Sequence, residues 1–215
     1  YTTLFRSSTL AARVKALAGI SLDSLLRKDR KPLGLQVRHE RLHSPRVSLR
    51  GVVAIASSTG GPRALTVILS TLPPDLPAAV VVAQHMSEGF TEGMVNWLAV
   101  NSRLPVQTAG EGTDLAPGNV YIAPSERNMQ VGRDGKILLT ERQANDIYRP
   151  SCDLLLNSVA RTYGAKSIGV ILTGMGSDGS LGMARIRQAG GVTIAQDASS
   201  SIVFGMAKAA IDNGS

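Results

Sequence analysis

Hydrophobic positions follow two alternating patterns along the chain after residue 50. Runs that are apolar throughout, at 52–56, 79–83 and 168–172, are typical of strands buried on both faces of a sheet. Segments of helix length lie between them, such as 63–71 and 151–163, the second with Ser151 as an expected N-cap. This alternation predicts a doubly wound α/β domain with a mostly parallel sheet flanked by helices.

The same patterns predict the remaining elements of this domain. Residues 127–141 alternate apolar and polar side chains around Asp134-Gly135, which predicts an inserted antiparallel β-hairpin with a two-residue turn. Three further helices are expected: at about 90–101, from the end of the glycine-rich turn at 173–179 to 188, and from about 206 onward. The other expected strands are short and lie at 106–108, 119–122, 192–195 and 202–204.

The first 50 residues differ in pattern and in charge. Apolar residues at 10–17 have helical spacing, and the basic stretches that follow are broken by Pro32, Gly34 and Pro45, so we interpret residues 1–50 as a linker or tail. They hold 11 Lys/Arg and 3 Asp/Glu, whereas residues 51–215 hold 12 and 13. The formal charge of +7 therefore belongs to the tail, and a nearly neutral main domain with 4% aromatic residues makes nucleic acid an unexpected partner.

Cysteine and histidine usage gives no indication of a metal or a cofactor. Cys152 is the single cysteine, so no intrachain disulfide can form, and a reducing cytoplasm fits best. His39 and His43 lie in the polar tail without nearby ligand residues and are interpreted as solvated. No apolar run reaches the roughly 18 residues of a membrane span, so membrane insertion is not expected. The chain begins at Tyr1 without a methionine, and we expect it to be a fragment of a longer protein.

The strand at 52–56 runs directly into the small residues Ser57, Ser58 and Thr59 and then into Gly60-Gly61. A strand that turns sharply into a helix exposes its turn residue at the carboxyl edge of the sheet, and the glycines let a substrate approach the backbone closely. Ser58 is therefore a candidate nucleophile. Two other interpretations stay open for this stretch alone: a plain turn with an N-capping hydroxyl, and a cradle for phosphate, although no P-loop or dinucleotide motif is present.

Two further candidates, His85 and Asp178, also lie in loops that follow buried strands. His85 is the single histidine after residue 50. A nucleophilic serine needs a base to take its proton, and the base needs a carboxylate to hold its tautomer, so one residue of each kind at a common sheet edge indicates a Ser-His-Asp triad. Asp178 could instead be a simple N-cap, and Asp197, which also follows a strand, competes for the position of the acid.

Five motifs in this order resemble the catalytic domain of CheB-type chemotaxis protein-glutamate methylesterases. They are Ala-Ser-Ser-Thr-Gly-Gly-Pro at 56–62, Gln-His-Met at 84–86 with Gly-Phe-Thr at 89–91, Tyr-Ile-Ala-Pro at 121–124, Arg-Pro-Ser at 149–151, and Leu-Thr-Gly-Met-Gly-Ser-Asp-Gly at 172–179. The resemblance covers residue 52 to the chain end and implies that Ser58, His85 and Asp178 form the family's triad. It also implies hydrolysis of glutamyl methyl esters, and usually deamidation of glutamines, on the cytoplasmic domains of methyl-accepting chemotaxis receptors.

The resemblance and the turn chemistry together suggest roles for the neighbouring residues. The backbone N–H of Thr59, and by resemblance that of Met175, would form the oxyanion hole. Gly60 and Gly61 would leave room for substrate. Arg149 would either face the substrate or pair with a local carboxylate.

The sequence departs from the family's usual pattern at two points. Ala56 and Ser57 replace the usual glycine and alanine, which leaves two adjacent serines, and the register of the following Thr-Gly-Gly favours Ser58. The family's N-terminal receiver domain, which a histidine kinase would regulate, is not among these 215 residues, and residues 1–50 resemble the tail of such a domain and its linker. Two alternatives are kept: the same chemistry on a signalling protein outside chemotaxis, and a non-catalytic module that binds an anion.

Overall fold

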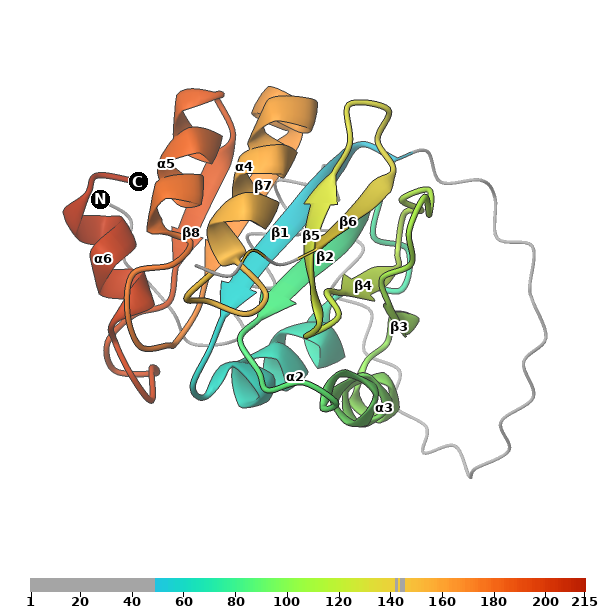
Figure 1. Cartoon of the computed structure of the whole chain (residues 1–215), viewed down its shortest axis with the longest axis horizontal. Coiled ribbons are helices and arrows are strands. Elements are labelled where there is room, and N and C mark those ends of the chain that lie inside the picture. The colour runs from blue at the N-terminus through green and yellow to red at the C-terminus, as the bar shows by residue number, and fades with distance from the viewer. Residues whose placement is uncertain (1–48, 142, 144–145) are drawn as a thin grey trace, which may run out of the picture.

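The computed structural model describes residues 49–141, 143 and 146–215 (Figure 1). The helix expected at 10–17, the two histidines of the tail and nearly all of the basic segment 1–50 lie outside the described residues. None of the helices within the described ranges is both long enough and apolar enough to cross a membrane.

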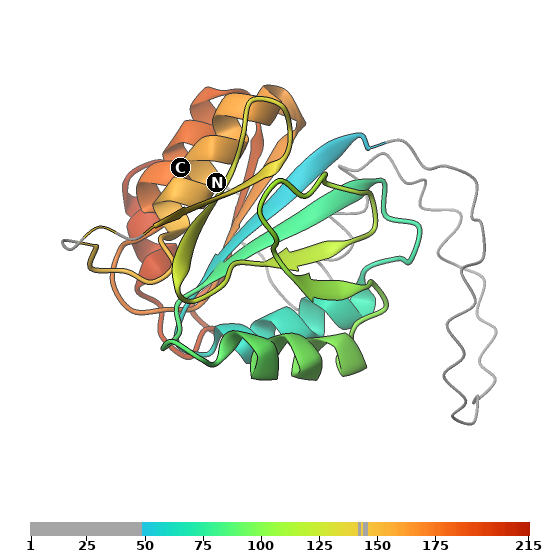
Figure 2. The same cartoon turned by 45° about the vertical axis from the view of Figure 1, so that its right-hand side comes forward.

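The described chain forms a six-stranded sheet with helices on both faces and a separate two-stranded hairpin (Figures 1 and 2). The sheet strands are β1 (Gly51–Ser57), β2 (Ala78–Gln84), β3 (Val106–Thr108), β4 (Val120–Ile122), β7 (Ser167–Ile171) and β8 (Val192–Ala195). The helices are α2 (Gly61–Thr71), α3 (Thr91–Asn101), α4 (Cys152–Tyr163), α5 (Ser180–Gln188), α6 (Met206–Asp212) and the short 3-10 helix η2 (Gly164–Lys166). Strands β5 (Arg127–Val131) and β6 (Ile137–Glu141) form the antiparallel hairpin, so the predicted fold class is confirmed.

The strand order β3-β4-β2-β1-β7-β8 places β1 in the middle of the sheet, and every neighbouring pair is parallel. From β1 the chain first winds to one side through β2, and it later returns to the other side of β1 through β7. Such a reversal of winding direction opens a crevice at the carboxyl ends of the strands, where doubly wound proteins bind their ligands. The topology therefore places the crevice at the ends of β2, β1 and β7.

Side chains of β1 alternate between two hydrophobic cores, one on each face of the sheet. Val53 and Ile55 pack into the core covered by α2 and α3, whereas Val52, Ala54 and Ala56 pack into the core covered by α4, α5 and α6. Each fully buried valine or isoleucine stabilises the fold by about 1.5–3 kcal/mol relative to an exposed one. Burial on both faces explains why this strand is apolar throughout, and it fixes the position of the loop that follows.

Two local predictions were wrong. The hairpin turn has three residues, 133–135, because Gly132 donates its N–H to Lys136 O at 2.8 Å, and Gly135 adopts a left-handed φ of 81°. Residues 202–204 do not form a strand: Phe204 makes one isolated bridge to Gly174. The N–H of Val203 is bound by the Thr173 side chain at 2.9 Å, so a regular ladder with the sheet does not continue there.

Candidate active site

The three candidate residues lie at the carboxyl ends of three adjacent strands. Ser58 follows β1, His85 follows β2, and Asp178 lies in the loop between β7 and α5. Backbone hydrogen bonds tie the three loops together: the His85 N–H donates to Ser57 O at 2.9 Å, and the Ser58 N–H donates to Thr173 O at 3.0 Å. Residues more than 90 positions apart in sequence are thus held at one edge of the sheet.

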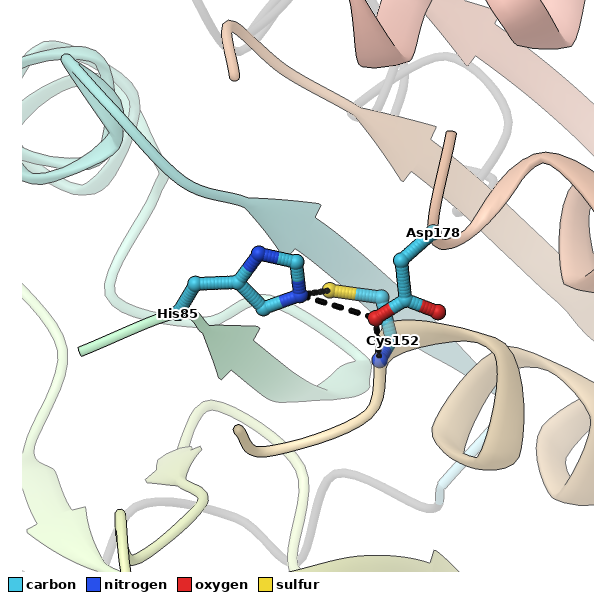
Figure 3. Close-up of side chains that lie close together, drawn as sticks. All are labelled: His85, Cys152 and Asp178. Carbon is cyan, nitrogen blue, oxygen red and sulfur yellow. Dashed lines mark hydrogen bonds and ion pairs between the residues drawn. The ribbon is translucent and has the colours of Figure 1, made fainter. Parts of the chain in front are cut away.

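His85 and Asp178 form a direct pair. His85 Nε2 lies 2.8 Å from Asp178 Oδ2, and Figure 3 shows the other ring nitrogen pointing away from the carboxylate. An ionised carboxylate only accepts hydrogen bonds, so Nε2 carries the proton in this pair. In the neutral imidazole, Nδ1 is then the unprotonated nitrogen, which is the state a general base requires.

Asp178 is held by the first turn of α4 on its other side. Its carboxylate is buried and accepts hydrogen bonds from the N–H groups of Cys152 at 2.7 Å and Asp153 at 2.9 Å. Burial by itself raises the pKa of Asp178, but the hydrogen bonds from His85 and from these two N–H groups outweigh it, and the pKa lies below its usual value. The α4 N-terminus and His85 therefore keep the carboxylate ionised.

The start of α4 has the cap that its sequence predicts. Ser151 has an extended backbone and its Oγ accepts the N–H of Leu154 at 3.3 Å. The same Oγ lies 3.5 Å from Asp178 Oδ1. The cap thus fixes the helix end that binds the carboxylate.

Cys152 is a neighbour of this pair that sequence reasoning missed. Its buried Sγ lies 3.4 Å from His85 Nε2 and donates to Ala83 O at 3.5 Å (Figure 3). Burial, together with the charge of Asp178, raises the pKa of the Cys152 thiol well above its usual value, so the thiol stays protonated. A single cysteine has no spacing pattern, so no signal in the sequence indicates a contact with a residue 67 positions away.

His85, Cys152 and Asp178 also form the one group of three or more potential metal-ligand side chains in the described part of the chain, with ligand atoms within 4.8 Å of one another. Metal binding would require the Cys152 thiolate, which its raised pKa opposes, and would replace the hydrogen bond between His85 and Asp178. The arrangement favours a hydrogen-bonded pair beside a neutral thiol.

The two adjacent serines have different environments. Ser57 is fully buried and its Oγ donates to Gln84 Oε1 at 2.7 Å, whereas Ser58 is partly exposed. No hydrogen bond joins the Ser58 hydroxyl to His85 within the described residues. Ser58 nevertheless contacts the third loop, because a Cβ added to Gly174 would lie 2.7 Å from Ser58 Cβ. Of the two serines, Ser58 is the one that a substrate can reach.

The expected oxyanion donors belong to residues next to Ser58 or next to the glycine that contacts it. Thr59 follows it directly, and Met175 follows Gly174, the residue that contacts it. Among the residues that the structure describes, the backbone N–H groups of Thr59 and Met175 have no acceptor. Both are therefore free to bind a substrate oxygen.

The glycines expected to face substrate also have local packing roles. Gly60 has a left-handed φ of 82° and caps α2. A Cβ on Gly61 would lie 2.0 Å from Gln84 Oε1 and 2.8 Å from Ser57 Cβ, so a side chain would disrupt the hydrogen bond between those residues. The turn requires both glycines whether or not they contact substrate.

Arg149 and Tyr148 line a hollow of about 680 Å³ beside His85. The exposed Arg149 guanidinium lies 4.0 Å from Glu88 Oε1, a loose pairing that leaves both proposed roles open. The Tyr148 ring stacks on His85, with centroids 5.1 Å apart and planes at 12°. Sequence reasoning missed Tyr148, although it directly precedes the Arg-Pro-Ser motif.

Asp197, the other candidate acid, does not contact His85. Its Oδ1 accepts hydrogen bonds from Ser199 Oγ at 2.6 Å and from the Ser200 N–H at 2.9 Å, which closes the turn after β8. The carboxylate beside the imidazole is that of Asp178.

Residues 53–215 match the family model described as CheB methylesterase. The chain belongs to the CheB methylesterase family. The crystal structure of the CheB methylesterase catalytic domain of Thermotoga maritima is similar, with a TM-score of 0.73 and 41% sequence identity over 76% of this chain and 88% of that one. The resemblance inferred from the five motifs is thereby confirmed.

Two of the similar curated proteins carry a double name. A protein-glutamate methylesterase/protein-glutamine glutaminase of Paramagnetospirillum magneticum is 51% identical over 76% of this chain and 46% of its own length. One from Anaeromyxobacter dehalogenans is 44% identical over 95% of this chain and 58% of its own length. The chain thus spans about half the length of the curated relatives it matches.

Proposed function

We propose that this CheB-family chain is a serine hydrolase that removes methyl groups from glutamyl methyl esters on methyl-accepting chemotaxis receptors, and that it also deamidates specific glutamines. Ser58 is the nucleophile, His85 the general base and acid, and Asp178 the carboxylate that orients His85. The observation that carries the proposal is the 2.8 Å pair of His85 and Asp178 beside the exposed Ser58 loop.

In the first half of the reaction, Ser58 Oγ attacks the ester carbonyl carbon and its proton passes to His85 Nδ1. The Nε2 proton stays in the hydrogen bond to Asp178, whose negative charge stabilises the imidazolium. The oxyanion accepts hydrogen bonds from the N–H groups of Thr59 and Met175. The tetrahedral intermediate then collapses: the C–O bond to the methoxy group breaks, His85 returns its proton to that oxygen, and methanol leaves a glutamyl ester on Ser58.

In the second half, His85 takes a proton from water, and the resulting hydroxide attacks the acyl carbon. Collapse breaks the bond to Ser58 Oγ, which regains its proton from His85, and the glutamate side chain is released. With a glutamine substrate the first leaving group is ammonia, and the second half is the same.

The relatives' names and the buried carboxylate favour this proposal over a non-catalytic anion-binding module. The anion-binding alternative predicts that His85 makes no hydrogen bond to Ser58, and this agrees with the geometry of the described residues. It gives no reason for an ionised carboxylate on the far side of the imidazole. Catalytic hydrogen bonds often tighten only in the substrate complex, so a separation of hydroxyl and imidazole does not oppose the hydrolase.

The proposed partners are the cytoplasmic domains of chemotaxis receptors, with regulation by a receiver domain and its histidine kinase. Arg149, exposed at the rim, would face acidic groups of the receptor, and Gly60 and Gly61 would let the substrate chain approach the Ser58 turn. Hydrolysis of the same ester on a signalling protein outside chemotaxis remains the alternative target.

The test is methanol release from methylated receptor membranes. Ser58→Ala should lower turnover by a factor on the order of 10⁶, as loss of a triad nucleophile does, while the melting temperature stays near that of the wild type. Ser57→Ala is the matched control. It removes the hydrogen bond to Gln84 and lowers the unfolding free energy by about 1–3 kcal/mol, but it keeps activity. Wild-type turnover in Ser58→Ala would end the assignment.

A further inference from the structure

Helix α3 has a buried face and a second, partly exposed apolar stripe, of which Met94 also packs against the edge of the core. Val95 and Leu98 pack into the core on one face of the sheet, and Thr91 is buried at the start of the same helix face. Phe90, Met94 and Trp97 recur at spacings of four and three residues, so they share a second face of the helix. Phe90 is 67% exposed and Trp97 is 45% exposed.

The second stripe forms one wall of a groove of about 490 Å³ that reaches His85. Pro62 and Met86 also line the groove, and His85 is the one titratable side chain in its lining. His85 and Met86 line the neighbouring hollow with Tyr148 and Arg149 as well, so the groove is continuous with the candidate active site.

Aromatic residues are scarce in this protein, which has one tryptophan and three phenylalanines. The tryptophan and one of the phenylalanines lie exposed in this groove and not in the core. Exposed aromatic and methionine side chains around a concave surface are the usual composition of a protein-binding hot spot.

We infer that this groove, lined by Phe90, Met94 and Trp97, binds an apolar side chain of the substrate protein close to the glutamyl ester. The inference rests on the proposed function, because it assigns the groove to the substrate of that site. It makes the α3 groove a determinant of specificity: the preferred ester would have an uncharged, apolar residue nearby on the substrate surface.

The position of the glutamyl ester indicates which molecule occupies the α3 groove. A glutamyl side chain is short, so a protein substrate whose ester reaches Ser58 must lay its neighbouring residues on the rim of the crevice. One part of that rim carries the charged groups of Arg149 and Glu88, and another part is the apolar α3 groove. The part of the substrate that lies over α3 therefore gains most by burying apolar surface.

Gly93 allows the groove to be altered without disturbing the fold. It lies in α3 within the groove lining, and a Cβ at this position would meet no atom within 4 Å. Gly93→Glu would place a charged side chain in the groove, and Gly93→Gln a neutral one of similar size. Both residues favour helix more than glycine does, so neither variant should melt below the wild type. Val100, which is 86% exposed on α3 and outside the groove lining, supplies the control Val100→Glu.

The experiment measures methanol release from two substrates: methylated receptor membranes, and N-acetylglutamate γ-methyl ester, which is too small to reach the groove and Ser58 together. For Gly93→Glu we expect KM for the receptor to rise about tenfold or more, with a smaller rise for Gly93→Gln. We expect kcat/KM for the small ester to stay within about twofold of the wild type. Val100→Glu should match the wild type on both substrates.

Three outcomes would overturn the inference. An unchanged receptor KM in Gly93→Glu would remove the groove from substrate binding, even if the variant altered self-association in gel filtration. Equal losses on both substrates would show damage to the reaction centre. If the wild-type protein released no methanol from either substrate, the proposed function would fail, and the inference with it, whereas the first two outcomes leave the proposed function standing.

Discussion

The Tyr148 ring lies nearly parallel to the His85 ring, with 5.1 Å between centroids. The hydrogen bond to Asp178 restrains one edge of the imidazole, and Tyr148 restrains one face. Together they allow little rotation of a ring that must present Nδ1 to Ser58. Tyr148 is thus a positioning residue in the proposed mechanism.

Loss of the Tyr148 ring should weaken catalysis moderately. Stacked aromatic pairs contribute about 0.5–1.5 kcal/mol beyond the area they bury, so Tyr148→Ala should lower kcat about 3- to 10-fold. Tyr148→Phe keeps the ring and should stay close to the wild type. Methanol-release kinetics of the two variants and the wild type would check this. Equal losses in the Phe and Ala variants would instead assign the effect to the hydroxyl, which lies close to Gly176.

Asp178 should make the free energy of unfolding depend on pH in the acidic range. Its pKa is lowered in the folded state, because the hydrogen bonds from His85 and the α4 N-terminus outweigh the opposing effect of burial. The ionised group therefore contributes its full stabilisation above the usual aspartate pKa, and that contribution is lost as the pH falls through the lower folded-state value. Urea unfolding between neutral pH and about pH 3 should show a shallower loss of unfolding free energy in Asp178→Asn than in the wild type. Parallel curves for the two proteins would contradict this prediction.

Because Gly174 contacts Ser58, we expect that position 174 does not tolerate a side chain. A Cβ on Gly174 would lie 2.7 Å from Ser58 Cβ and 2.2 Å from Met206 Sδ. The methionine can move, but Ser58 or its loop must also shift. Misplacement by about 1 Å can cost on the order of 100-fold in rate, and overpacking typically costs about 1–3 kcal/mol in stability.

Gly174→Ala should therefore lose turnover and melting temperature together in assays of both quantities. The matched control for melting temperature is Gly93→Ala, where the added methyl meets no atom within 4 Å and should not destabilise the protein. An active, stable Gly174→Ala variant would show that the two loops have room to separate.

The fold was predictable because its signals are local. An unbroken apolar run such as β1 is compatible with burial on both faces and with little else, and each candidate residue could be assigned to a strand end from its immediate neighbours. The hairpin was also visible, but the length of its turn depended on the pairing of Gly132 with Lys136, which a sequence pattern does not determine.

The surroundings of the candidate site were less accessible to sequence reasoning. Asp178 and Asp197 both follow strands, and only the structure shows that Asp197 closes its own turn. Cys152 and Tyr148 reach His85 across more than 60 residues of sequence, so no spacing rule identifies them. Whether the three proposed catalytic residues act together stays a prediction for the Ser58 and Asp178 variants.

The separation of the strand ends from the helices that connect them has a consequence for how the proposed activity could diversify. The proposed reacting groups follow the adjacent strands β2, β1 and β7, whereas α3 carries the apolar groove that a protein substrate would touch. Exchanging α3 between relatives should therefore transfer target preference and leave the proposed chemical step intact, so new targets could evolve while the residues around His85 stay unchanged.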